Sequence, residues 1–432
     1  MRSLYCCRSL EPTTLLPTPA VAARMKLKCL PEDFQVEELS EFEIQGGNYA
    51  VYKLTKTSLG TPEAIEAILR RWKIKREHIS YGGLKDRHAI TQQYVTISRG
   101  PRRDLNQQNF TLVYQGQTKQ HFGPTDISGN RFHIVIRDLP RNVAQKYVNL
   151  RESLLVDRLP NYFDDQRFGS LGASREFIAQ PWCAGNYERA LWLALAEPNP
   201  HDRPDDREEK RILRDNWGNW VDCKAKLAQS SRRSIVTYLC DHPTNFKNAF
   251  ALIRVDLRGL FLSAYQSYLW NHILAELIRS KVWHERVYEV GLSAQQVAFC
   301  TSLTMEEQDE LSRVKLPLPS ARIDLEGSAL EAHYENVLRE LGIELRELRV
   351  KYPRDSFFSK GERPALIVPH NLQMAMASDE QYAGRYKVTC DFELPRGSYA
   401  TIVLKRLTLD PTAVSERTHE AAGSSVAVAE ED

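Results

Sequence analysis

Segments with the pattern of β-strands lie near both ends of this chain, and helical patterns fill much of its middle. Hydrophobic and polar residues alternate with the two-residue period of a half-buried strand. The alternating segments are 33–39, 49–54, 92–98, 110–115, 131–137 and 385–394. This distribution predicts an α+β fold in which one sheet-containing domain is split in sequence, with a more helical segment inserted between its halves.

The helices are predicted from apolar residues that recur every three or four positions. Thr61-Pro62 supplies an N-cap and a first-turn proline, and an amphipathic helix follows with Ile65, Ile68, Leu69 and Trp72 on one face. Further helices are predicted at 143–157, 304–314 and 328–341, and a long buried one around 261–273. The charged segment 197–215 contains several prolines, which predicts a surface loop.

These patterns divide the chain into five parts. They are an extension at 1–24, the first part of the split domain at 25–165, the insertion at 166–367, the second part at 368–408, and a tail at 409–432. Both end segments have too few apolar residues to join a core, so we predict that they are disordered. A targeting peptide is the alternative for the first 24 residues.

Several common kinds of site are missing from the sequence patterns. The eight cysteines show no CxxC spacing and the histidines no HxH or HExxH spacing, which argues against a metal site or a disulfide framework. No nucleotide-binding glycine motif and no apolar run of about 18 residues occurs. We therefore expect no metal and no membrane association, and the unpaired cysteines favour a reducing compartment such as the cytoplasm.

Positive charge is concentrated in one segment of a nearly neutral chain. The formal net charge is +2, whereas Arg70 to Arg103 contains ten Lys and Arg residues against Glu77 and Asp86. Such a patch suits a polyanion bound on one face. A solvated helix face is the alternative interpretation.

Asp86 is the acidic residue that we consider the best candidate for a role in catalysis. It follows Gly82-Gly83 and lies within Lys85-Asp86-Arg87-His88, at the start of a predicted strand. A carboxylate among cations can act as a nucleophile or base on a polyanionic substrate whose phosphates the cations hold. Alternatively, the acid only pins a turn through bonds to the backbone.

A longer motif around Asp86 resembles the signature of the TruD family of pseudouridine synthases: Gly83-Leu84-Lys85-Asp86-Arg87-x-Ala89-x-Thr91-x-Gln93. Five further segments are similar to the family's other blocks, in the same order. They are KCLPEDFQVEE (28–38), GNRF (129–132), PNYFDDQRFG (160–169), LSAYQSYLWN (262–271) and LPRGSYAT (394–401). Together the blocks cover nearly the whole chain.

The resemblance implies a fold and a set of site residues. The fold would be a pseudouridine-synthase catalytic domain with a mixed, largely antiparallel sheet and an inserted, more helical TRUD domain. Asp86 would be the catalytic residue, and the substrate-binding residues would be Lys28, Asn130, Phe132, Lys85 and Arg87. Asn161, Gln166 and Arg167 are further candidates for orienting the pocket.

The resemblance also implies the reaction. The family isomerises uridine to pseudouridine in tRNA, at position 13 of the D arm, without a cofactor or a metal, and we expect a monomer with tRNA as its partner. Phe132 has no hydroxyl and so cannot be the base that removes the C5 proton. The alternative function is a non-catalytic RNA-binding or RNA-chaperone module, against which the intact Asp86 argues. Lys405-Arg406 departs from the family's usual Arg-Glu, which we expect to affect only a peripheral ion pair.

Overall fold

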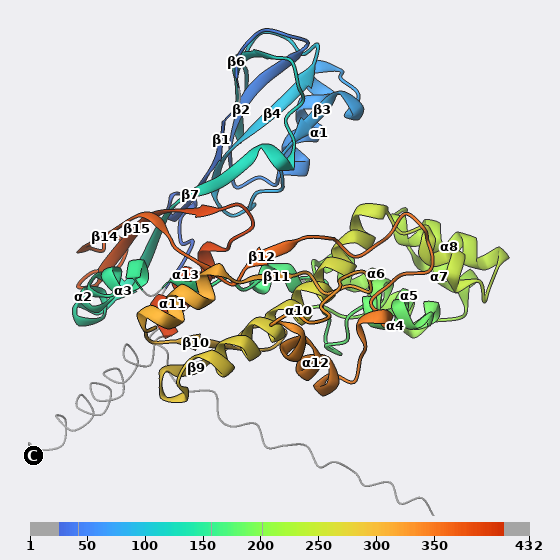
Figure 1. The fold of residues 1–432 in the computed structure, drawn as a ribbon. Coiled ribbons are helices and arrows are strands. Elements are labelled where there is room, and N and C mark those ends of the chain that lie inside the picture. The colour runs from blue at the N-terminus through green and yellow to red at the C-terminus, as the bar shows by residue number, and fades with distance from the viewer. Residues whose placement is uncertain (1–25, 42, 157, 201, 410–432) are drawn as a thin grey trace, which may run out of the picture.

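The computed structural model describes residues 26–409, except 42, 157 and 201. Of the segments predicted to be disordered, 1–24 and 409–432, all but Leu409, the last residue of a helix, lie outside the described residues. Figure 1 shows an upper lobe built from β1 to β6 with α1, a helical lobe that contains α4 to α12, and a third region around β14, β15 and α13. Strand β7 runs from the upper lobe into this third region.

One nine-stranded sheet organises the upper lobe and the third region. Its strands are β1 (Phe34–Ser40), β2 (Tyr49–Thr57), β3 (Ile79–Tyr81), β4 (Ile90–Ser98), β5 (Leu105–Gln107), β6 (Phe110–Thr118), β7 (Ile127–Leu139), β14 (His370–Ser378) and β15 (Tyr386–Pro395). The order is β14-β15-β7-β1-β4-β2-β6-β5, with β3 paired to β4. The β1–β4 pair is parallel and the others are antiparallel. The predicted α+β class with a mixed, largely antiparallel sheet is confirmed.

Most helices belong to the helical lobe, and four lie against the sheet. Those with the sheet are α1 (Thr61–Trp72), α2 (Arg141–Asn149), α3 (Arg151–Val156) and α13 (Ala400–Leu409). The others are α4 (Ala179–Ala184), α5 (Tyr187–Leu195), α6 (Pro204–Asp215), α7 (Trp220–Lys226), α8 (Ser231–Asp241), α9 (Phe246–Ala251), α10 (Val255–Lys281), α11 (Met305–Arg313) and α12 (Glu331–Glu340). Two-stranded pairs join β9 (Val287–Gly291) to β10 (Gln296–Cys300), and β11 (Lys315–Pro317) to β12 (Glu362–Pro364).

The chain leaves the sheet region and returns to it through two short strands that pair with each other. In β8 (Leu159–Pro160), Leu159 faces Ile367 of β13 (Leu366–Ile367) in an antiparallel pair. The predicted boundaries at 165/166 and 367/368 lie close to this pair and stay predictions.

Three buried hydrophobic clusters correspond to the three regions. Ala64, Ile65 and Ile68 of α1 pack on the upper part of the sheet. A second cluster joins β7, β15, α2 and α13. The largest cluster fills the helical lobe around Trp182 and Trp270 of α4 and α10. Each cluster buries the apolar face that its amphipathic elements present, which is the main source of their stability.

Two local predictions were wrong for identifiable reasons. Segment 197–215 contains the helix α6, because Pro204 stands in the first turn, where its missing N–H costs nothing, and Ile212 and Leu213 are buried. Thr61 is not an N-cap, since Gly60 occupies that position and Thr61 lies inside the helix. The predicted helix 143–157 is present as two helices, α2 and α3, which meet at Leu150.

A buried ion cluster ties three distant segments of the sheet region together. Arg137 of β7 bonds both carboxylate oxygens of Asp33 at 2.8–3.0 Å and reaches Asp379 at 2.9 Å. The three side chains are at most 4% exposed. Removing the guanidinium would leave two carboxylates buried without a cation, which is far more costly than leaving an exposed charge unpaired.

We therefore expect Arg137→Met to lower the free energy of unfolding by about 3–5 kcal/mol. The matched control is Arg131→Met on the same strand, whose side chain is 54% exposed and pairs with Glu37 and Glu393. The control should cost no more than about 1 kcal/mol. Urea unfolding measures both values, and equal losses in the two variants would contradict the role assigned to the cluster.

Candidate active site

Asp86 lies in the loop between β3 and β4, just before β4 runs parallel to β1. Its carboxylate accepts a hydrogen bond from Lys28 Nζ at 3.0 Å and from Gln166 Nε2 at 3.2 and 3.4 Å. The Asp86 side chain is 28% exposed, so it is open to a ligand while both partners hold it. One partner precedes β1 and the other comes from the segment that leads into the helical lobe.

Buried polar side chains hold the backbone of this loop in place. Lys56 of β2 is fully buried, and its ammonium donates to the carbonyl oxygens of Leu59 (2.7 Å), Lys85 (3.3 Å) and Asp86 (2.7 Å). Thr61 accepts from the Lys85 N–H at 3.0 Å, and Gln93 donates to the Gly83 carbonyl at 3.0 Å. Burial lowers the pKa of Lys56 to about 8. Gly83, Lys85 and Asp86 are thus fixed through their main-chain atoms.

A pocket of about 230 Å³ opens beside the carboxylate. Its lining comes from β1, β7, the Asp86 loop, the segment that carries Gln166, and the start of α13 with the loop before it. The lining residues are Phe34, Val36, Leu84, Lys85, Asp86, Asn130, Phe132, Gln166 and 397–401. Phe132 stacks on Phe392 with ring centroids 5.5 Å apart and is 7% exposed. The pocket therefore has an aromatic wall beside a carboxylate, which suits a flat polar ring.

Gly129 explains why the aromatic wall is so close to its neighbouring strand. A Cβ at this position would lie 2.5 Å from the carbonyl oxygen of Leu394 in β15. The pairing continues with Asn130 opposite Leu394 and Phe132 opposite Phe392. The glycine of the GNRF segment is thus required for the close approach of β7 and β15, and this approach sets the positions of Asn130 and Phe132.

The structure places the six residues predicted for the site in two groups. Asp86, Lys28, Lys85, Asn130 and Phe132 gather at the pocket, whereas Arg87 does not line it. Lys85 turns its ammonium to Glu38 at 3.1 Å and to the amide oxygen of Asn130, and Arg87 pairs with Glu63. The cation at the carboxylate is therefore Lys28. The RNA contacts predicted for Lys85 and Arg87 stay a prediction.

Two further groups shape the pocket from the side of the helical lobe. Asn161 accepts from Arg363 at 2.6 Å and from Ser398 at 3.1 Å, and so supports the loop at 397–401. Lys405 bonds Asp164 and Asp165, directly before Gln166. The expectation that Lys405 affects only a peripheral ion pair was wrong, because this pair anchors the segment that carries Gln166.

Sequence reasoning missed Lys56 and Glu38. Lys56 lies between two threonines just beyond the predicted strand at 49–54, and Glu38 follows Glu37 at the end of the KCLPEDFQVEE block, so neither stands out in the strand pattern. Their partners in the Asp86 loop are distant in sequence. Gln166 is predicted only as one of three candidates for orienting the pocket. Its neighbours in PNYFDDQRFG give no indication that it contacts Asp86, since this contact depends on how the helical lobe meets the sheet.

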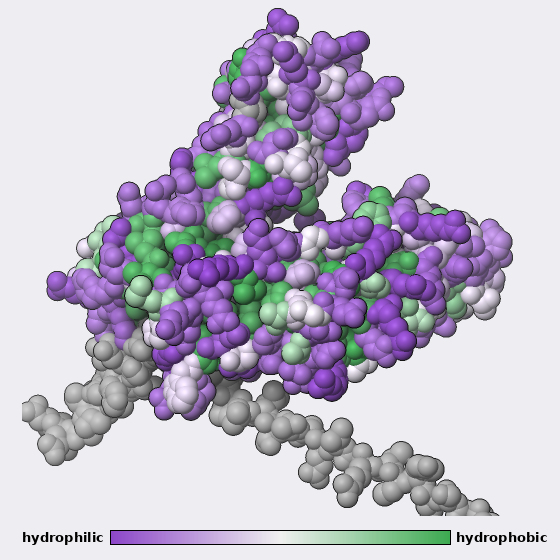
Figure 2. Space-filling view, in the orientation of Figure 1, coloured by the Kyte–Doolittle hydropathy of each residue, from purple (hydrophilic) through white to green (hydrophobic). Residues whose placement is uncertain are grey.

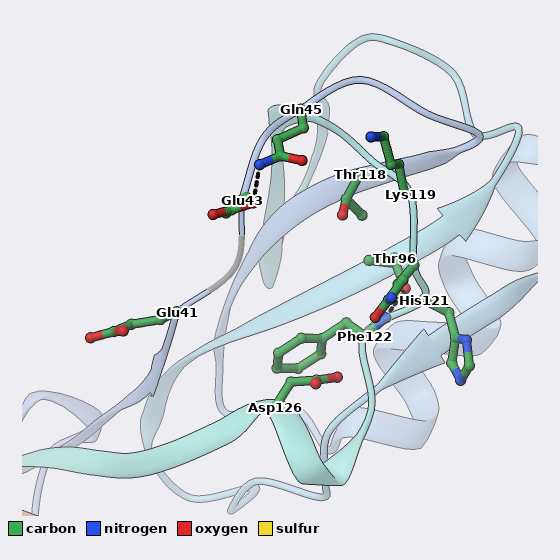
Figure 3. A pocket seen from close by; sticks show the side chains of 10 residues that line it. Glu41, Glu43, Gln45, Thr96, Thr118, Lys119, His121, Phe122 and Asp126 are labelled. Atoms are coloured by element: carbon green, nitrogen blue, oxygen red, sulfur yellow. Dashed lines mark hydrogen bonds between the residues drawn. The ribbon is translucent and has the colours of Figure 1, made fainter.

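A second pocket of about 340 Å³ lies in the upper lobe but does not gather groups for catalysis. Figure 3 shows the Glu41 and Glu43 side chains extending to the left of the view, whereas the Asp126 carboxylate points to the right. Asp126 accepts from the Gly123 N–H at 2.7 Å, a local turn contact. Within the part of the chain that the structure describes, no group of three His, Cys, Asp or Glu side chains is arranged to hold a metal, and no helix is long and apolar enough to cross a membrane. The Asp86 pocket is therefore the candidate active site.

The chain is similar to a family of known proteins along most of its length. Residues 16–407 match the sequence profile of the family described as "tRNA pseudouridine synthase D (TruD)". A protein of Methanocaldococcus jannaschii named "Probable tRNA pseudouridine synthase D 2" is 34% identical, over 94% of this chain and 93% of its own. The "tRNA pseudouridine synthase D" of Aquifex aeolicus is 27% identical, over 89% of this chain and 98% of its own.

The fold has a solved counterpart. A crystal structure of the TruD protein from Methanosarcina mazei superposes with a TM-score of 0.64 at 23% sequence identity, and covers 88% of this chain and 93% of that chain. At this level of identity the likeness concerns the fold alone. The family match over nearly the full length, together with the six sequence blocks and the shared fold, shows that this chain belongs to the TruD family.

Proposed function

We propose that this protein is a pseudouridine synthase that converts uridine to pseudouridine in tRNA, at position 13 of the D arm, with Asp86 as its catalytic residue. The observation that carries the proposal is the Asp86 carboxylate, held by Lys28 and Gln166 at the edge of a pocket with an aromatic wall. Membership of the family supports the choice of reaction.

One carboxylate is sufficient for this chemistry. The reaction breaks the N-glycosidic bond and remakes a bond from C1′ to C5 of the same uracil, so nothing is oxidised and no water is consumed. Hydrolysis of an ordinary glycoside needs a second carboxyl group to protonate a poor leaving group, whereas uracil leaves as a delocalised anion. Asp86 either attacks C1′ or removes the 2′ proton, and both routes place its carboxylate next to the ribose.

The surrounding residues fit the other requirements. Lys28 balances the charge of Asp86 in the presence of RNA phosphates, and Asn130 offers an amide at the rim of the pocket. Phe132 gives the detached uracil a flat surface on which to rotate before it is joined again through C5. A uridine must first leave its RNA stack, at a cost of a few kcal/mol.

Basic residues on the upper lobe offer contacts that help to offset this cost. Arg70 and Arg71 in the last turn of α1, and Lys73 after it, have exposed side chains. Figure 2 shows a notch between the upper lobe and the helical lobe with hydrophilic residues on both sides, and α1 lies on the side of the upper lobe that faces the helical lobe in Figure 1. RNA phosphates bound along α1 would bring the flipped uridine to the pocket.

We expect Asp86→Asn to fold normally and bind tRNA, because phosphate contacts carry most of the affinity. It should release no tritium from tRNA labelled at C5 of uridine, since the amide has lost the nucleophilicity of the carboxylate. The matched control is Asp126→Asn in the second pocket, which should release tritium like the wild type. Substantial release by a well-folded Asp86→Asn protein would exclude the proposed mechanism, and pseudouridine mapping in the product tests the position.

Phe132 has a matched control in the ring stacked behind it. Phe132→Leu and Phe392→Leu remove rings from the same buried cluster, so each should cost a similar amount of stability, on the order of 1–3 kcal/mol. Of these two rings, only Phe132 lines the pocket. We therefore expect only Phe132→Leu to lower kcat/KM beyond what its loss of stability explains. The loss should correspond to roughly 1–3 kcal/mol of activation free energy, which is the energy of one base–aromatic stack. Equal losses of kcat/KM in the two variants would show that Phe132 acts only by packing in the core.

The basic residues of α1 should control how tRNA binding depends on salt. Replacing Arg70, Arg71 and Lys73 with Ala should flatten the slope of log K against log [salt] by about 0.7–0.9 for each RNA phosphate that the protein no longer neutralises. Titrations of labelled tRNA at several salt concentrations measure this slope. An unchanged slope would show that the RNA phosphates bind to another face.

A further inference from the structure

Lys56 is a buried cation that the proposed chemistry does not use. It lies near the end of β2 with no exposed surface, and its ammonium contacts three backbone carbonyls. Among the described residues it forms no ion pair with a carboxylate. Burying an ammonium without a counter-ion is costly, so a hydrophobic residue at this strand position would serve the core better. The contacts of the ammonium therefore indicate a reason to keep it.

The three carbonyls belong to two loops that meet at the active site. Leu59 O lies in the turn between β2 and α1, while Lys85 O and Asp86 O belong to the Asp86 loop. An ammonium has three N–H donors, so each carbonyl can receive one of them. The contact to Asp86 O is on the main chain of the same residue whose carboxylate faces the pocket. A shift of this carbonyl moves the carboxylate with it.

We propose that Lys56 is a positioning residue for catalysis: by donating to the main chain of Lys85 and Asp86 it holds the Asp86 carboxylate in place, without itself touching the substrate. This inference rests on the proposed function of Asp86. A misplacement of a reacting group by about 1 Å can cost 10²-fold in rate. The inference thus predicts that loss of the ammonium lowers kcat and leaves tRNA binding nearly intact.

The protonation state of Lys56 gives the inference a second signature. A neutral amine has two N–H donors instead of three, so one of the three carbonyls loses its partner when Lys56 is deprotonated. Burial lowers the pKa of Lys56 from 10.5 to about 8. The positive charges of Lys85 and Arg87 also lower this pKa, and the negative charge of Asp86 raises it. Activity should therefore fall as the pH rises through about 8.

This alkaline loss is not an unfolding effect of Lys56. Between the folded pKa of about 8 and the unfolded value of 10.5, the unfolded chain binds more protons at this residue than the folded chain. Stability rises with pH wherever the unfolded state binds more protons. Lys56 thus makes the fold more stable over the same pH range in which it ceases to hold the loop, so kcat and stability change in opposite directions.

The test compares Lys56→Met, which keeps the chain length but has no donor, with Lys53→Met on the same strand. Lys53 pairs with Glu37 and is 30% exposed, so its replacement should leave the kinetics unchanged. For Lys56→Met we expect kcat for tRNA to drop on the order of 100-fold at neutral pH, with KM within about twofold of the wild type. The alkaline fall of kcat should be present in the wild type and in Lys53→Met, and absent from Lys56→Met.

The possible results separate clearly. A folded Lys56→Met with wild-type kcat, a loss confined to KM, or an unchanged alkaline fall would each overturn the inference. If Lys56→Met does not fold, the wild-type profile decides: a fall of kcat through pH 8 with unchanged circular dichroism supports the inference, and a flat profile overturns it. Asp86→Asn keeps the two proposals apart. An active Asp86→Asn removes the proposed function, whereas an inactive Asp86→Asn beside a fully active Lys56→Met removes only the role of Lys56.

Discussion

The parallel pairing of β1 with β4 is the contact on which the candidate site depends. It is short, with Gln35, Val36 and Glu37 opposite Ile90, Thr91 and Gln92. Through it the upper part of the sheet, which supplies Asp86, is joined to β7, which supplies Phe132. Antiparallel partners on both outer sides continue the sheet, but no other strand pair bridges these two parts within the described residues. A shift by one residue in this register would turn each side chain of the shifted strand to the opposite face.

The distribution of charge around the site differs from what the local sequence Lys85-Asp86-Arg87 suggests. Lys85 and Arg87 pair with Glu38 and Glu63, while Lys28 from the start of the chain pairs with Asp86. The acids and bases of neighbouring segments thus form separate pairs, and each pair fixes a different element. Buried polar side chains hold the main chain of the Asp86 loop, and the Asp86 carboxylate stays accessible from the pocket.

The sequence could predict most of the sheet but little of this pairing. Strand positions are visible because alternation is a local property, and the predicted segments at 33–39, 92–98 and 131–137 correspond to β1, β4 and β7. The ligands of Lys56 are main-chain carbonyls, which carry no side-chain signal at all. The prolines of 197–215 predict a loop, although Pro204 begins a helix there, because burial of Ile212 and Leu213 is a tertiary effect. Family resemblance supplied Lys28, Asn130 and Phe132, which local chemistry alone would not have selected.

The β8–β13 pair has a consequence for how this fold can be modified. Because Pro160 faces Leu366 and Leu159 faces Ile367, the two ends of the intervening segment are neighbours at the spacing of hydrogen-bonded strands. A short hairpin turn is long enough to connect them, so the sheet itself does not fix the length of the segment between them. Gln166 would be lost if this segment were exchanged, together with the anchor that Asp164 and Asp165 give to Lys405. The sheet therefore permits the helical lobe to vary in length, on the condition that each replacement restores a hydrogen-bond donor opposite Asp86.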